Sequence, residues 1–98
     1  MAQEDAYAIA KAGGRHGAFY RVYRQRRTAE IRRGIRSLTQ RIQEHMNKMS
    51  DPVRHVVDFA QLDLRQQHAL LTSKWPADIH RLQEQKDILA GILQERAR

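Results

Sequence analysis

Apolar residues recur along most of this chain at intervals of three and four positions, which is the period of one face of an α-helix. The clearest run is spaced 4, 3, 4, 4 and 3 and comprises Ile31, Ile35, Leu38, Ile42, Met46 and Met49. The positions between are largely polar, so we expect a helix from Ala29 to Met49 with this stripe facing the core. No segment shows the strict alternation of a half-buried strand, and the pattern predicts an all-α fold.

Glycines, prolines and capping residues divide the rest of the chain into short helices. Gly13-Gly14 should end the first helix in a left-handed turn, and Thr28, Asp51 and Asp63 are suited to helix N-caps. A helix should also stop before Pro76, because the residue preceding a proline is disfavoured in helical geometry. The expected helices are Gln3 to Ala12, His16 to Gln25, Ala29 to Met49, a short one from Pro52, Leu64 to Lys74, and Ala77 to Glu95.

These five to six helices with short turns should close around one core. A chain of 98 residues has the length of one domain. We therefore expect residues 1–98 to form a single compact helical domain. Its core leaves little room for an enclosed active site, which favours a surface cleft.

The net charge of +7 lies entirely in the first half of the chain. Residues 1–50 contain 11 Lys and Arg against 4 Asp and Glu, whereas residues 51–98 contain 7 of each sign. Arginine dominates, and its planar guanidinium suits bidentate phosphate contacts and stacking on bases. We expect Arg32, Arg33 and Arg36, on the outer side of the long helix, to meet RNA phosphates. A basic face that is merely solvated is the alternative interpretation.

Several classes of site are not expected from the composition. The chain has no cysteine, which excludes disulfides, thiolate nucleophiles and Cys-based zinc sites. No two of the five histidines share the helical spacing of metal ligands, so we expect neither a metal nor a cofactor. No apolar run approaches the roughly 18 residues that span a bilayer, and no export signal is visible, so we expect no membrane anchoring.

His16 is the first candidate for chemistry, because it lies in the glycine-rich turn Gly13-Gly14-Arg15-His16-Gly17. Glycines let backbone amides approach an anion, and the helix that follows adds positive potential at its N-terminus. Arg15 and this turn are therefore predicted to hold a phosphate with the imidazole beside it. An exposed histidine in an ordinary turn explains the same residues.

Aromatic residues in the basic half could stack on bases, since aromatics between arginines are typical of single-strand binding. Tyr20 and Tyr23 lie three apart among arginines, and we expect at least one of them in the core. Lys74 and Trp75 precede Pro76 at a helix junction, where Trp75 is more simply explained as a core anchor.

Three segments carry a resemblance to a known family: AKAGGRHGAFYRVY, AEIRRGIRSLTQRIQEHMNKMSDP and LDLRQQHALLTSKWPADIHRLQEQKDILAGIL. Together they resemble a small C-terminal toxin domain of bacterial polymorphic toxins of the filamentous haemagglutinin, contact-dependent growth inhibition and RHS types. The similarity spans most of the chain from Ala10 to Leu93. Arg15 stands where the family usually has lysine, which preserves the charge, and Leu64 stands where proline is expected.

This resemblance implies a domain carried by a large secreted polypeptide, delivered to the target-cell cytoplasm and neutralised at home by a cognate immunity protein. We expect that inhibitor to be acidic, since it must capture a basic domain. Such toxin domains are most often nucleases. Metal-dependent DNA hydrolysis usually requires clustered carboxylates, which the basic half lacks, whereas RNA carries its own nucleophile in the 2′-hydroxyl.

The sequence therefore predicts a metal-independent ribonuclease, with tRNA as one candidate substrate. A non-catalytic nucleic-acid-binding module and a membrane-active toxin are the alternatives. His16 would be the general acid or base, and Glu44 or His45 the second proton-transfer group. The remaining candidates are Lys11, Arg15 and Lys74 for phosphate, and Tyr20 or Trp75 for base stacking or orientation.

Overall fold

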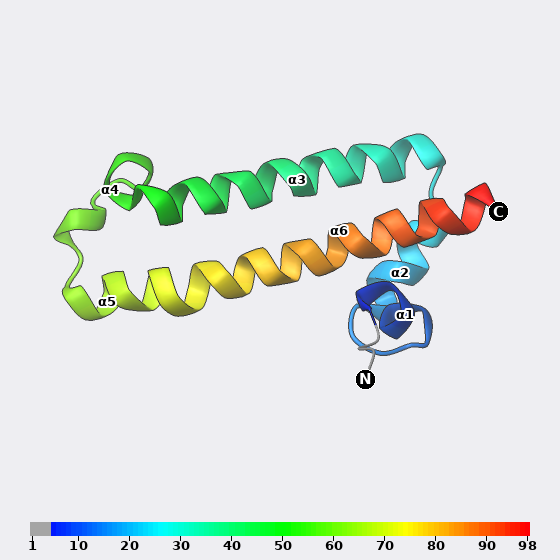
Figure 1. Ribbon diagram of the computed structural model, residues 1–98, viewed down its shortest axis with the longest axis horizontal. Helices are drawn as coiled ribbons and strands as arrows, with labels where there is room; N and C mark the ends of the chain where they lie inside the picture. Colours follow the sequence, from blue (N-terminus) through cyan, green and yellow to red (C-terminus); the bar gives the residue numbers. More distant parts are fainter. Residues whose placement is uncertain (1–4) are drawn as a thin grey trace.

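Two long antiparallel helices, α3 (Thr28–Ser50) and α6 (Trp75–Ala97), form the body of the protein (Figure 1). The structure is a computed structural model that describes residues 5–98. Within that range the chain forms six α-helices, one 3-10 turn and one π-helical segment, with no strand. The predicted all-α fold of five to six helices is confirmed.

Two short helices, α1 (Ala6–Lys11) and α2 (Gly17–Arg24), pack near the C-terminal end of α6 (Figure 1). The Asp5 side chain caps α1 by accepting a hydrogen bond of 2.7 Å from the Ala8 amide. The predicted start at Gln3 lies outside the described residues. Gly13 has a φ of 95°, which confirms the left-handed turn predicted after the first helix.

The core lies between α3, α6 and the two short helices. On α6, Leu82, Ile88, Leu89 and Ile92 are fully buried, and the α3 stripe meets them through Ile31, Leu38 and Ile42. Because the helical period brings one face of each long helix to the interface, this part of the predicted stripe is confirmed.

The stripe does not stay buried along the whole of α3. Met46 is 50% exposed, so the prediction that it belongs to the core is wrong. At this level of the helix pair, His45 Nε2 lies 3.6 Å from a carboxylate oxygen of Asp78 on α6. A polar contact thus takes the place of apolar packing where α3 approaches its C-terminal end.

The predicted break before Pro76 is also wrong. Helix α5 (Leu64–Ala69), the π-helical segment η2 (Leu70–Lys74) and α6 follow one another as one continuous helical rod (Figure 1). Trp75, the residue directly before the proline, keeps helical angles, with φ −65° and ψ −42°. In a π turn the hydrogen bonds span five residues, and the wider turn gives the proline ring room that a regular helix lacks. Pro76 then occupies the first turn of α6, where a missing N–H has little effect.

The far end of the helix pair is closed by α4 (Pro52–His55) and the 3-10 turn η1 (Phe59–Gln61). Two of the three predicted caps are confirmed: Asp51 accepts from the Arg54 amide, and Asp63 forms a capping box with Gln66. Thr28 instead begins α3 as its first residue, after Arg27.

A small second cluster anchors this end. Phe59 stacks on Trp75 with ring centroids 5.9 Å apart, and both side chains are buried. The interpretation of Trp75 as a core anchor is therefore confirmed. Nearby apolar side chains at Val53, Val57 and Leu64 are exposed.

The protein measures 51 × 32 × 22 Å, an elongated form that the length of the helix pair explains.

Candidate functional site

The turn between α1 and α2 is fastened to the middle of α6 through Glu84. Arg15 donates from Nε to both carboxylate oxygens of Glu84, at 3.0 and 3.1 Å. His16 Nε2 lies 3.4 Å from Oε1 of the same carboxylate. The structure thus brings together two of the predicted site residues and joins them to a carboxylate from the other end of the chain.

His16 is held in place by its backbone as well as by its side chain. It adopts a left-handed conformation with a φ of 64° immediately before Gly17, where α2 begins. Only 14% of its side chain is exposed. A non-glycine residue in this conformation is uncommon and is typical of positions that the surrounding structure determines.

The electrostatics of this cluster determine which nitrogen of His16 carries a proton. Burial raises the pKa of Glu84, but hydrogen bonds from Arg15 and His16 and the nearby positive charges outweigh burial, so that the pKa falls below its usual value. The ionised carboxylate can only accept hydrogen bonds, so Nε2 of His16 carries the proton that points at it. When the imidazole is neutral, Nδ1 is an acceptor, the form that a general base requires.

A second imidazole, which the sequence analysis did not single out, approaches the same oxygen. His80 Nε2 lies 3.8 Å from Oε1 of Glu84, and 74% of the His80 side chain is exposed. The two residues lie four apart on α6, so one turn of helix brings them to the same face. The spacing of four residues between His80 and Glu84 is the signal in the sequence that identifies this pair.

Two of the predicted residues belong to a different network, at the end of α6. Tyr20 donates a hydrogen bond of 2.9 Å to Glu95, and Lys11 forms an ion pair of 3.0 Å with the same carboxylate. Tyr7 also donates to it. Tyr20 is 3% exposed, so neither face of its ring is open to a nucleotide base. These contacts tie α1 and α2 to α6 and give Tyr20 a structural role.

The same network strongly stabilises the ionised form of Glu95. The hydrogen bond from Tyr7, followed by those from Lys11 and Tyr20, outweighs burial and lowers the pKa of Glu95 to about 2. Burial and the hydrogen bond to Glu95 raise the pKa of Tyr20. Both tyrosines are therefore hydroxyl donors to a carboxylate.

His45 lies at another level of α6 and does not join His16. Its Nδ1 lies 2.9 Å from the Arg41 carbonyl, so this nitrogen carries a proton, and its Nε2 faces Asp78. Asp78 lies six residues before Glu84, which places the two carboxylates about 9 Å apart along the axis and on different sides of the helix. The structure therefore separates the two histidines that were predicted to share the proton transfers.

The other predicted residues near His45 are engaged locally. Lys74 donates a hydrogen bond of 3.3 Å to Asp78, which helps to lower the pKa of Asp78 against the opposing effect of burial. Glu44 is exposed and accepts a hydrogen bond from Gln40 on its own helix. Trp75 is buried against Phe59. None of these contacts places the three residues beside His16.

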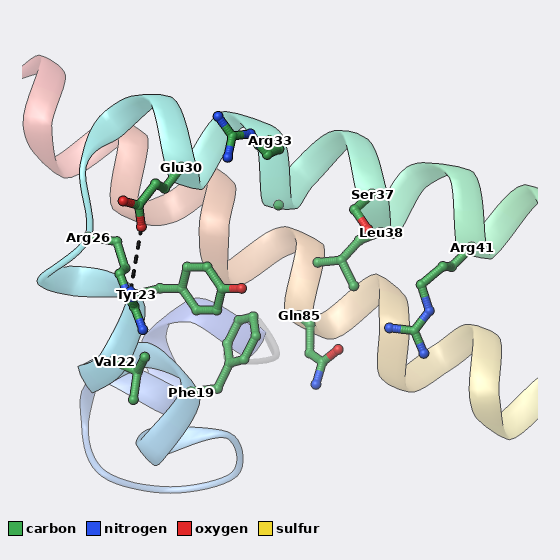
Figure 2. A pocket seen from close by; sticks show the side chains of 11 residues that line it. Phe19, Val22, Tyr23, Arg26, Glu30, Arg33, Ser37, Leu38, Arg41 and Gln85 are labelled. Atoms are coloured by element: carbon green, nitrogen blue, oxygen red, sulfur yellow. Dashed lines mark ion pairs between the residues drawn. The ribbon is translucent and has the colours of Figure 1, made fainter.

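A cleft of about 620 Å³ opens between α2, α3 and α6 (Figure 2). Phe19 and Tyr23 of α2 lie along one side, with ring centroids 4.7 Å apart. The other lining side chains are mostly polar or basic: Val22, Arg26, Glu30, Arg33, Ser37, Leu38, Arg41 and Gln85, together with Gly34. Arg26 pairs with Glu30 at 3.7 Å.

The arginines of α3 are divided between two faces. Arg33 and Arg41 line the cleft, whereas Arg32 and Arg36 are exposed and do not line it. With 3.6 residues per turn, Arg32 and Arg36 lie on the side of α3 opposite Gly34, which lines the cleft. Of the three α3 arginines predicted to meet phosphate, only Arg33 lies in the cleft, and Arg26 and Arg41 were not singled out in advance.

Comparisons with known proteins identify no related family or structure. No protein-family model, curated protein or solved structure matches the chain. Across residues 5–98 there is no group of three or more metal-ligating side chains placed to hold a metal ion. None of the helices in that range is both long and apolar enough to cross a membrane.

Proposed function

We propose that this chain is a metal-independent ribonuclease domain whose reaction centre comprises His16, His80 and Arg15 around Glu84. The observation that carries this proposal is the approach of two imidazoles and a guanidinium to one carboxylate. Cleavage of RNA through its own 2′-hydroxyl requires a base, an acid and a cation at the phosphate. The cluster contains side chains capable of each role.

In this mechanism Nδ1 of His16 accepts the proton of the 2′-hydroxyl. The O2′–P bond then forms while the P–O5′ bond breaks, and protonated His80 donates to the departing 5′-oxygen. The products are a 2′,3′-cyclic phosphate and a free 5′-hydroxyl. Glu84 is a positioning residue, since it orients His16 through Nε2.

Arg15 is suited to stabilise the negative charge that develops on the phosphate. Only its Nε contacts Glu84 within residues 5–98, which leaves the donors of its two terminal amino groups for the non-bridging oxygens. The exposed arginines of the first half would attract the RNA chain as a whole.

A cleavage assay with purified protein and end-labelled RNA tests the proposal. We expect fragments that end in a 2′,3′-cyclic phosphate. Their yield should not fall when a chelator is added, and they should be absent when the RNA carries 2′-deoxyribose at the cleavage site. His16→Ala and His80→Ala should each lower the cleavage rate about 10²- to 10⁴-fold, the range of general acid-base catalysis, and leave RNA affinity unchanged.

The control variants are His55→Ala and His68→Ala, which alter exposed histidines remote in sequence from the cluster. Both should cleave like the unmodified protein. Full cleavage by His16→Ala would refute the proposed centre. RNA binding without any cleavage by the unmodified protein would instead identify a non-catalytic binding module.

The resemblance of the sequence to polymorphic-toxin domains supports a biological setting for this activity. We propose that the domain is delivered by a large secreted carrier into the cytoplasm of a target bacterium, where it cuts RNA, with tRNA as one candidate. An acidic immunity protein would neutralise it in the producing cell. Expression in bacteria should arrest growth and degrade RNA, and coexpression of an acidic protein encoded immediately downstream should restore growth.

A further inference from the structure

The cleft between α2, α3 and α6 combines an aromatic side with a basic side. Phe19 and Tyr23 offer partly exposed aromatic rings on one side. Arg33 and Arg41 line the opposite side. Neither forms an ion pair with a carboxylate anywhere in residues 5–98. Glu30 is the only acidic residue of the lining, and it already pairs with Arg26.

We propose that this cleft binds an unpaired nucleotide of single-stranded RNA, with the base against Tyr23 and Phe19 and the flanking phosphates on Arg33 and Arg41. This inference rests on the proposed ribonuclease function and names the form of its substrate. Alternating aromatic and basic contacts are the means by which proteins hold single strands, because every base has a face that can stack.

The dimensions of the cleft agree with this ligand. Its volume of about 620 Å³ lies within the range of roughly 300 to 1,000 Å³ of sites that bind small molecules, a size class that includes a nucleotide. Arg33 and Arg41 lie eight residues apart on α3, or about 12 Å along its axis. At about 3.4 Å per phosphate in a stacked strand, the two arginines are far enough apart to contact two different phosphates, one on each side of the bound nucleotide.

Two polar side chains in the cleft are suited to read the edge of a base. Gln85 of α6 and Ser37 of α3 both line it (Figure 2). An amide can donate and accept at the same time, and a hydroxyl can do either. A base paired in a duplex presents neither its face nor its pairing edge, so the cleft favours single strands over double strands.

Gln85 also connects the cleft with the proposed reaction centre. It directly follows Glu84 on α6, and Phe19 lies one helical turn after His16. A strand held in the cleft therefore lies on the elements that carry the reacting side chains.

The test is a binding titration with short fluorescent RNA in which every 2′-hydroxyl is methylated, so that cleavage cannot occur. The unmodified protein should bind the single strand at least tenfold more tightly than a hairpin duplex of the same length. Arg33→Gln combined with Arg41→Gln should flatten the dependence of log affinity on log salt by about 1.4, because each lost phosphate contact contributes about 0.7 for single strands.

The matched variant combines Arg32→Gln with Arg36→Gln, which removes the same charge from the other face of α3. It should change the slope much less. Equal slopes for the two double variants, or equal affinity for single strand and duplex, would overturn the inference and show general charge attraction only. The inference would also be overturned if an acidic polypeptide bound as tightly as the RNA and lost affinity to the same extent in the Arg33 and Arg41 double variant.

A further variant tests the aromatic side. Tyr23→Leu should weaken single-strand binding about tenfold without altering the salt slope, as expected for loss of one stacking contact. Its thermal unfolding is measured in parallel, because Tyr23 also packs against the core. Since methylated RNA reports binding alone, failure of the cleavage assay would count against the proposed ribonuclease while leaving this cleft measurement intact.

Discussion

Glu84 Oε1 lies 3.4 Å from Nε2 of His16, although the two residues are 68 positions apart in the sequence. This contact and the neighbouring ion pair of Arg15 fasten a glycine-rich turn to the long C-terminal helix. The orientation of His16 therefore depends on α6. A turn that is flexible by composition becomes a defined position for an imidazole.

Replacement of the Glu84 carboxylate should disturb the orientation of His16 without weakening the binding of RNA. Glu84→Gln retains the shape of the side chain but loses the charge that orients His16 and pairs with Arg15. We expect the turnover rate to fall about 10- to 100-fold, by analogy with the loss seen when a group that orients a metal-bound histidine is removed. RNA affinity should not decrease, which a titration with methylated RNA measures.

The control for this variant is Asp87→Asn, since Asp87 is an exposed carboxylate of the same helix that accepts a hydrogen bond from Gln83. It should leave turnover unchanged. A parallel loss of RNA affinity and turnover in Glu84→Gln would contradict an orienting role.

The network around Glu95 should make stability sensitive to acid. The pKa of Glu95 is about 2 in the folded protein against a usual value of 4.5. Because the folded-state pKa is depressed, the stabilisation is fully present above pH 4.5 and is lost as the pH falls towards 2. Glu95→Gln should lower the free energy of unfolding by on the order of 2 kcal/mol near neutral pH.

Urea unfolding measured at several pH values checks this expectation. The difference between the unmodified protein and Glu95→Gln should be constant at neutral pH and should narrow in the acid range. Glu44→Gln alters an exposed carboxylate whose one side-chain hydrogen bond within residues 5–98 comes from Gln40, and it should show no such difference at any pH. A pH-independent difference for Glu95→Gln would rule out the ionised network as its source.

Two glycines of the long helices should respond differently to alanine. A Cβ at Gly91 would lie 2.3 Å from the Tyr7 ring, whereas one at Gly34 would lie 2.9 Å from the end of the Leu89 side chain and at an ordinary contact distance of 3.6 Å from Tyr23. Alanine favours a helix by about 1 kcal/mol over glycine. We expect Gly91→Ala to be destabilising by about 1 to 3 kcal/mol, since α1 must move, despite this gain.

Gly34→Ala should cost less, because its nearest neighbour is the flexible end of a leucine side chain at 2.9 Å and not a rigid ring at 2.3 Å. The two free energies of unfolding are compared under identical conditions. A Gly91→Ala variant as stable as the unmodified protein would show that α1 packs less closely on α6 than the structure indicates.

The proposed acidic inhibitor should recognise the same basic face as RNA. Arg33→Glu combined with Arg41→Glu should slow its association and weaken RNA binding together, and added salt should slow association with the unmodified protein. Arg54→Glu combined with Arg65→Glu changes the net charge equally at the far end of the helix pair and should affect both much less. Association rates from surface plasmon resonance decide between these outcomes.

Local sequence signals predicted much of the architecture. The spacing of Ile31, Leu38 and Ile42 defined the buried face of α3, Asp51 and Asp63 marked helix starts, and Gly13 marked a left-handed turn. These signals are reliable because a cap or a helical period acts within a few residues of its own position. The concentration of arginine in the first half was likewise a property of the sequence alone.

The tertiary structure decided what those local rules could not. The π-helical segment continues without a break into α6, which contains Pro76, although the rule for residues before proline predicted that the helix would stop there. Whether an arginine of α3 faces a cleft or open solvent depends on where α2 packs, which separates Arg33 from Arg32. The partner of His16 lies 68 residues away. Such contacts arise only when distant helices pack, because the free energy that selects them belongs to the shared core and not to any short segment.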